Sequence, residues 1–101
     1  MEKKKKIKLS VIIPCYNETE TIVSIIKKVR LAKPHDKEII IVDDFSTDGT
    51  REKLIKHKNK IDTLILKKSN SGKGAALRDG IKAAHGKVVI FQDADLEYDP
   101  N

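Results

Sequence analysis

The stretch EIIIVDDFSTDGT, residues 38–50, predicts the architecture of this chain. Its first part is apolar at consecutive positions, which is typical of a strand buried on both faces of a parallel sheet. Two aspartates and a turn rich in helix-capping residues follow at once and lead into a short helix. A buried strand that passes through a polar turn into a helix is the repeating unit of an α/β fold.

The same unit recurs along the whole chain. We expect strands at residues 8–14, 38–44, 62–68 and 87–93, and helices between them at residues 17–32, 50–60 and 75–86. In the first helix Asn17 is the expected N-cap, with Glu20 completing a capping box. The order βαβαβαβ predicts an α/β fold with a Rossmann-like parallel sheet built from right-handed βαβ units. In such sheets ligands bind at the carboxyl ends of the strands.

Length and composition indicate a small globular domain. The chain has 101 residues, of which 39% are hydrophobic and 36% charged, and no apolar run approaches the length of a membrane span. The N-terminal MEKKKKIKLS lacks the apolar core and cleavage site of a signal peptide. The single cysteine, Cys15, excludes an intramolecular disulfide framework. We therefore expect an intracellular, cytoplasmic protein.

The formal charge of +6 is concentrated at the N-terminus, where residues 1–8 contain five lysines and one glutamate. We expect residues 1–8 to form a disordered basic tail and residues 9–101 to form the domain. The tail is either simply solvated or attracted to an anionic membrane surface. Nucleic-acid binding is not expected, because the chain has only two Tyr and two Phe, without basic and aromatic residues interleaved.

Polar side chains follow each predicted strand. After the first strand Tyr16 offers an aromatic face and a hydroxyl, and Glu18 a carboxylate, without the glycine-rich turn of a dinucleotide-binding fold. After the second strand an extended backbone points Asp43 and Asp44 in opposite directions. One of the two can face a ligand, such as a uracil or guanine N–H, while the other fixes the loop. The alternative role, capping the next helix, is already filled by Ser46, Thr47 and Asp48.

The third and fourth strands end in segments suited to phosphate and metal. In NSGKG, residues 70–74, glycines allow close backbone approach, and Lys73, the helix start and Arg78 one and a half turns later supply positive potential for an anion. The spacing is not that of a Walker loop. After the fourth strand Asp93, Asp95 and Glu97 alternate, so an extended chain places them on one side. Oxygen ligands of this kind suit Mg²⁺ or Mn²⁺ bridging to substrate phosphates.

Four ordered motifs together resemble a known family. SVIIPCYNE, IIIVDDFSTDGT, NSGKGAALRDGIKAAHG and FQDADLEYDP, spread over residues 10–100, are similar to the N-terminal, nucleotide-binding half of family 2 glycosyltransferases with the GT-A fold. The branch most like this chain contains the dolichyl- and polyprenyl-phosphate mannose or glucose synthases. The chain departs from many members in having Phe45, where they have glycine after the acidic pair.

The resemblance implies a nucleotide-diphosphate sugar donor bound across the strand ends. By position it places Pro14, Tyr16 and Glu18 at the nucleoside, Asp43 or Asp44 at the base, and Lys73 and Arg78 near the diphosphate or the base. It makes Asp93 and Asp95 the metal-binding Asp-x-Asp, with Glu97 as a further metal ligand. The acceptor would be a polyprenyl phosphate at the membrane surface, or a saccharide. Because members of the family continue well past this motif, the sequence predicts a fragment that is inactive alone.

Two other functions fit parts of the pattern. A non-catalytic nucleotide-binding module would use the same strand ends without transferring a sugar. A phosphoacceptor receiver domain also has an aspartate pair after one strand and an acceptor aspartate, here Asp93, after a later one. The receiver alternative leaves SVIIPCYNE and the Gly-Lys-Gly loop without a role, and the oligomeric state and the catalytic residues are not predicted.

Overall fold

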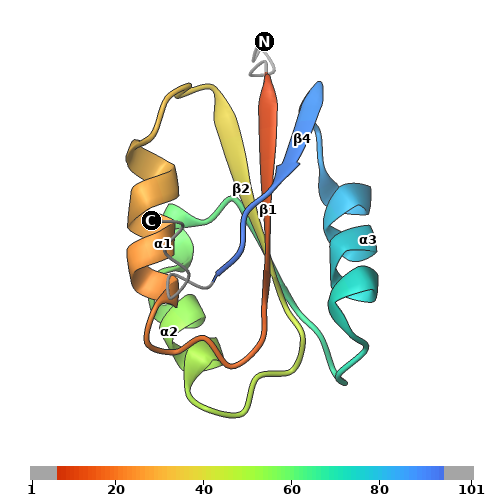
Figure 1. The fold of residues 1–101 in the computed structure, drawn as a ribbon. Helices are drawn as coiled ribbons and strands as arrows, with labels where there is room; N and C mark the ends of the chain where they lie inside the picture. Colours follow the sequence, from red (N-terminus) through yellow and green to blue (C-terminus); the bar gives the residue numbers. More distant parts are fainter. Residues whose placement is uncertain (1–6, 95–101) are drawn as a thin grey trace, which may run out of the picture.

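A parallel sheet of four strands lies between two layers of helices (Figure 1). The computed structural model describes residues 7–94. In chain order its elements are β1 (Leu9–Cys15), α1 (Ile22–Leu31), β2 (Lys37–Asp43), α2 (Thr50–Lys56), the short 3₁₀ helix η1 (Lys58–Lys60), β3 (Thr63–Leu66), α3 (Lys73–Ala83) and β4 (Val88–Phe91). The predicted α/β class with a Rossmann-like sheet is confirmed.

The strands are arranged in the order β3-β2-β1-β4, and each neighbouring pair is parallel. Val11 in the middle of β1 pairs with Ile39 of β2 on one side and with Ile90 of β4 on the other. The chain thus builds outward from β1 to β3 and returns through α3 to the far side of β1. This is the order of a Rossmann half, whereas a receiver domain has β1 between β2 and β3, so the receiver alternative is wrong.

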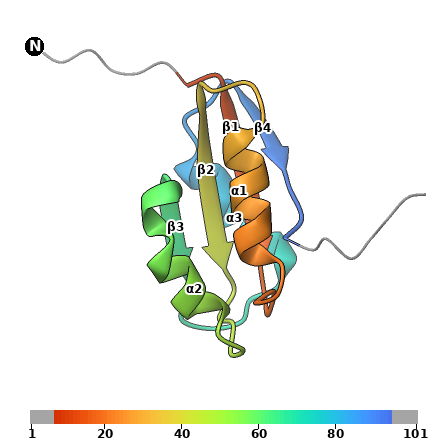
Figure 2. The same cartoon turned by 90° about the vertical axis from the view of Figure 1, so that its left-hand side faces the viewer.

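Each face of the sheet has its own core. Figure 2 views the face that α1 and α2 cover, where alternate strand residues such as Val11 and Ile39 pack against the buried face of α1. On the opposite face Ile12, Ile40 and Val42 pack with Ala76 of α3. A Cβ added at Gly80 would lie 2.5 Å from Ile12 Cγ2, so a residue without a side chain lets α3 approach the sheet.

The N-terminus of α1 differs from the prediction. The helix begins at Ile22 after Thr21, which makes no side-chain capping hydrogen bond, so the predicted Asn17–Glu20 capping box is wrong. Asn17 instead has φ of 53°, and its Oδ1 accepts a hydrogen bond from the backbone N of Thr47 at 2.8 Å. Its side chain bonds to the loop after β2 because that loop lies beside the turn after β1.

A buried carboxylate joins the strands at their amino ends. The carboxylate of Glu38 accepts hydrogen bonds from Ser10 Oγ at 2.6 Å and from the backbone N of His85 at 2.5 Å. Burial raises the pKa of the Glu38 carboxyl, but these hydrogen bonds, strengthened by the His85 imidazole, outweigh burial and hold the pKa below its ordinary value. Because Ser10 and Glu38 are buried, this cluster stabilises the end of the sheet far from the strand carboxyl ends.

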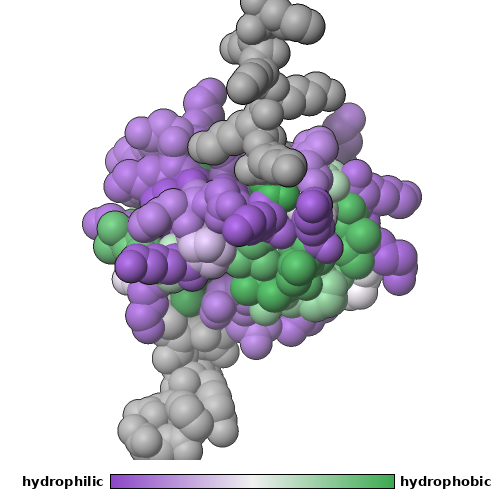
Figure 3. All heavy atoms as spheres, turned by 90° about the horizontal axis from the view of Figure 1, so that it is seen from above, coloured by the Kyte–Doolittle hydropathy of each residue, from purple (hydrophilic) through white to green (hydrophobic). Residues whose placement is uncertain are grey.

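The edge strand β4 presents apolar side chains to the surface. Val88, Val89, Ile90 and Phe91 are each between 36% and 56% exposed. The view from above shows the largest group of apolar atoms toward one side, among mostly polar atoms (Figure 3). Among residues 7–94, no helix has both the length and the apolar character needed to cross a membrane.

Candidate functional site

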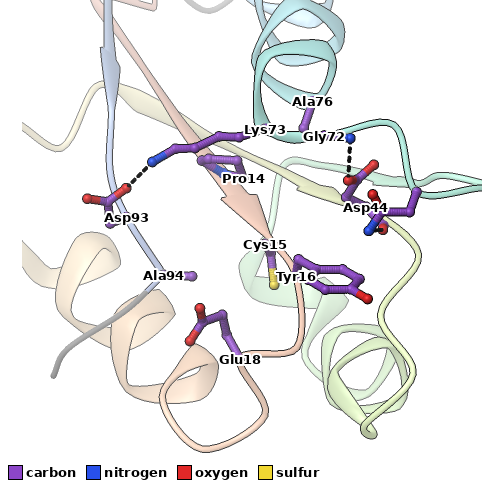
Figure 4. A pocket seen from close by; sticks show the side chains of 11 residues that line it. Pro14, Cys15, Tyr16, Glu18, Asp44, Gly72, Lys73, Ala76, Asp93 and Ala94 are labelled. Atoms are coloured by element: carbon purple, nitrogen blue, oxygen red, sulfur yellow. Dashed lines mark hydrogen bonds and ion pairs between the residues drawn. The ribbon is translucent and has the colours of Figure 1, made fainter.

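A pocket of about 510 Å³ opens at the carboxyl ends of the strands (Figure 4). It lies where the strand order reverses between β1 and β4, the position at which open α/β sheets bind ligands. Its size falls within the range typical of small-molecule sites. Its walls come from all four strand-end segments and comprise Pro14, Cys15, Tyr16, Glu18, Asp44, Asn70, Gly72, Lys73, Ala76, Asp93 and Ala94.

The segments after β1 and β2 are bonded into one wall. Backbone N of Asn17 donates to Ser46 Oγ at 2.8 Å, and backbone N of Glu18 donates to Thr50 Oγ1 at 3.0 Å. The capping-type residues of FSTDGT therefore hold the neighbouring loop as well as their own turn. Tyr16, in this wall, is about half exposed and lines the pocket.

Asp43 and Asp44 have different environments, as their opposite directions predicted. Asp43 is fully buried and does not line the pocket, and its carboxylate accepts from Ser46 Oγ at 2.6 Å and pairs with Arg51 at 3.1 Å. Asp44 lines the pocket, and its two oxygens accept from the backbone N of Ser71 at 2.9 Å and of Gly72 at 2.8 Å. Asp43 thus fixes its own turn, whereas Asp44 holds the loop before α3.

Phe45, between this pair and Ser46, has φ of 68°. That left-handed conformation favours glycine, the residue that the resemblance leads one to expect here, and is strained for a bulky side chain. The Arg51 guanidinium lies over the Phe45 ring, with its Cζ 5.6 Å from the ring centroid. The turn therefore keeps the backbone shape of a glycine turn with an aromatic residue in it.

The third and fourth strand ends meet through an ion pair across the pocket. Lys73 Nζ lies 2.9 Å from Asp93 Oδ1, and the two side chains are 64% and 69% exposed. Figure 4 shows Lys73 extending from the start of α3 toward Asp93 at the end of β4. Arg78 follows on α3 and is exposed, and its Nη1 would lie 3.7 Å from a Cβ at Gly74, so it extends along the first turn without lining the pocket.

Most of the predicted site residues therefore surround one pocket. The structure brings together six of them, namely Pro14, Tyr16, Glu18, Asp44, Lys73 and Asp93, while Asp43 lies beneath the wall and Arg78 lies beside it. Asp95 and Glu97 lie outside the described residues. Among residues 7–94 no group of three or more His, Cys, Asp or Glu side chains is placed to hold a metal ion.

Four lining residues were not predicted, namely Cys15, Asn70, Ala76 and Ala94. Asn70 donates a hydrogen bond from Nδ2 to the backbone O of Asp44 at 3.3 Å. Its position in a small-residue loop after a strand was the sequence feature that could have indicated a place in the pocket. Cys15 is 2% exposed, and burial, followed by the negative charges of Asp43, Glu18 and Asp48, raises the pKa of its thiol well above the ordinary value. The thiol therefore stays protonated at neutral pH and acts as a small packing group.

The fold and the strand-end pocket define a class, the α/β proteins that bind ligands at a topological switch point. Comparison with known proteins narrows this class to one family. Residues 10–101 match the model described as Glycosyl transferase family 2, and this chain belongs to that family.

Named relatives show how broad the family is. The chain is 39% identical over 92 residues to the poly-beta-1,6-N-acetyl-D-glucosamine synthase of Staphylococcus aureus strain COL, covering 90% of this chain and 22% of the synthase. It is 32% identical over 100 residues to the dodecaprenyl-phosphate galacturonate synthase of Rhizobium johnstonii, covering 93% of this chain and 30% of that enzyme. The chain therefore spans less than a third of the length of either relative.

A solved structure shares the fold. The mannosyltransferase PcManGT from Pyrobaculum calidifontis, solved in complex with GDP-Man and Mn²⁺, superposes with a TM-score of 0.74 at 30% identity. The match covers 89% of this chain and 28% of the mannosyltransferase. The predicted resemblance to GT-A family 2 enzymes is confirmed.

Proposed function

We propose that the pocket binds the nucleoside diphosphate of an activated sugar, and that the protein to which this chain belongs transfers the sugar to an acceptor. One observation carries the proposal. The loops after all four strands converge on one pocket, at the place where this type of sheet binds ligands. That pocket is lined by carboxylates as well as by an ammonium group. Family membership supports glycosyl transfer as the reaction class, and we propose that the transferred sugar is a hexosyl group.

Each wall suits one part of such a donor. Pro14 and Tyr16 offer apolar and aromatic surface to a nucleoside, with Glu18 beside them. Asp44 is the base-facing member of the acidic pair, because each carboxylate oxygen keeps a second lone pair for a base N–H after accepting from the loop. Asp43 is a positioning residue beneath it.

The charge of the pocket suits a divalent cation. Glu18, Asp44 and Asp93 contribute three carboxylates to the walls, against one ammonium from Lys73. A diphosphate entering such a pocket is repelled unless further positive charge accompanies it. Asp93 presents hard oxygen ligands at the mouth, which fit Mg²⁺ or Mn²⁺, and Asp95 and Glu97 would complete the set with phosphate oxygens.

The chemistry follows from these charges. A bound Mg²⁺ or Mn²⁺ supplies Lewis-acid neutralisation of the departing nucleoside diphosphate. Asp93 would help to hold that cation, and Lys73 and Arg78 would add positive charge on the α3 side. The acceptor oxygen would form a bond to the anomeric carbon as the bond from that carbon to the donor's phosphate oxygen breaks. A hydroxyl acceptor would have to give its proton to a base, whereas an anionic lipid phosphate needs little general-base help.

Two chemical classes of acceptor are consistent with the relatives. The name of the rhizobial relative contains a dodecaprenyl phosphate and that of the staphylococcal relative a polysaccharide. We propose a polyprenyl phosphate or a saccharide, with the basic N-terminal segment favouring the cytoplasmic face of a membrane in the first case.

The proposal is tested by titrating the ¹⁵N-labelled chain with UDP-, GDP- and dTDP-sugars, with and without Mg²⁺. Shifts should cluster at Tyr16, Asp44 and Gly72 and should be strengthened by the metal. Asp93→Asn should lose the metal-dependent part, while Asp79→Asn, the same change at an α3 carboxylate that pairs with Lys67 and does not line the pocket, should not. Shifts scattered away from the pocket, or metal enhancement unchanged in Asp93→Asn, would contradict the proposal.

A further inference from the structure

We infer that Lys73 is a built-in counter-ion for Asp93, which couples binding of the divalent cation to binding of the diphosphate. The inference rests on the proposed function and adds the way in which the site is regulated. In the absence of donor the ammonium holds the carboxylate; when a diphosphate arrives, the ammonium transfers to phosphate oxygens and frees the carboxylate for the metal.

The Lys73 ammonium already occupies the carboxylate that a divalent cation would need to bind. Lys73 Nζ is 2.9 Å from Asp93 Oδ1, so a metal ligated by that oxygen would lie within a few ångströms of the ammonium. Like charges at such a distance repel, and an oxygen engaged by the ammonium is a poorer metal ligand. Metal alone therefore competes with Lys73 for Asp93.

The ammonium has a second destination within the same pocket. Both side chains line the cavity and both are mostly exposed, so the lysine stem can swing without disturbing the core. A compact ammonium on a flexible stem binds phosphate oxygens as a point charge. A diphosphate in the pocket thus draws Lys73 away from Asp93.

The backbone of the same loop is less available for an anion. Asp44 already accepts hydrogen bonds from the amides of Ser71 and Gly72, two of the groups that the glycine-rich loop was expected to offer to a phosphate. Lys73 is therefore the group of this loop that can change partners when the diphosphate enters. The loop stays fixed while one side chain moves.

The coupling is small because the pair is exposed. An exposed ion pair contributes little free energy. Its loss changes an equilibrium constant by at most about five-fold. We expect Mn²⁺ alone to bind Lys73→Met about two- to five-fold more tightly than the unaltered chain. By linkage, UDP or GDP should enhance Mn²⁺ binding less in Lys73→Met than in the unaltered chain.

The experiment measures free Mn²⁺ by electron paramagnetic resonance for the full chain, alone and with saturating UDP or GDP. Lys73→Arg keeps the charge and should behave as the unaltered chain, and Lys82→Met removes an exposed lysine from the far end of α3. Equal or weaker Mn²⁺ binding by Lys73→Met, or an equal gain in Lys82→Met, would overturn the inference.

The outcomes separate the inference from the proposed function. If Mn²⁺ and nucleotide bind the unaltered chain cooperatively and Lys73→Met leaves that cooperativity unchanged, the function stands and the counter-ion role is wrong. If the unaltered chain binds neither Mn²⁺ nor nucleotide at this pocket, both fail.

Discussion

Asp44→Asn tests how the pocket is built. The carboxylate accepts from the amides of Ser71 and Gly72 at 2.9 and 2.8 Å, while an asparagine offers one acceptor oxygen and turns an NH₂ toward the other amide. A hydrogen bond to a charged group contributes about 1.5–3 kcal/mol. At 1.4 kcal/mol per factor of ten, the local opening constant of the loop should rise about 10- to 150-fold.

Amide hydrogen exchange measured by NMR reports this opening residue by residue. Ser71 and Gly72 should exchange faster in Asp44→Asn, while the amides of β2 provide the internal reference for global unfolding. Asp79→Asn makes the same chemical change further along α3, where the carboxylate pairs with Lys67, and should leave the loop amides protected. Equal protection of Ser71 and Gly72 in both variants, with β2 intact, would refute the role of Asp44 as the residue that holds the loop.

Three further perturbations probe packing, protonation and strain. Gly80→Ala should lower the unfolding free energy by about 1–2 kcal/mol in urea titration, because overpacking against Ile12 exceeds the helix-propensity gain. Gly74→Ala should not destabilise, because its added Cβ would meet only Arg78 Nη1 at 3.7 Å, an ordinary contact distance. Stability should fall as pH drops below about 5. The folded-state pKa of Glu38 lies below its ordinary 4.5, so the stability that its carboxylate contributes above that value is lost when it is protonated. Thermal melts at several pH values should show a weaker dependence of stability on pH in Glu38→Gln. Phe45→Asn should change stability by less than about 0.5 kcal/mol, whereas Phe45→Val should cost more than about 1 kcal/mol, since asparagine tolerates a positive φ and a β-branched residue does not.

The apolar pattern was sufficient to predict the elements of the fold. Ile39, Ile40 and Ile41 are buried on alternating faces of β2, so their consecutive apolar positions had only one compatible environment, the middle of a parallel sheet. The position of the site followed from the same pattern, because polar residues after parallel strands meet at one edge. Six predicted residues line one pocket for that reason.

Side-chain partners were less predictable than elements. Asn17 stands at a plausible cap position, yet a tertiary contact with Thr47 determines its conformation. The choice between Asp43 and Asp44 stayed open because alternation shows that the two side chains diverge but not which of them is buried. Only the packing of Arg51 and Ser46 around Asp43 decides it.

The buried thiol of Cys15 offers a practical use. It is the sole cysteine of the chain, it lies in the pocket wall at the end of β1, and it remains protonated at neutral pH. An alkylating reagent therefore reacts only when that wall parts, since the thiolate is the reactive form. The rate of Cys15 alkylation by iodoacetamide, measured by pulse labelling and mass spectrometry, would thus report how often the pocket wall opens without any engineered probe. A bound donor would be detected as slower alkylation.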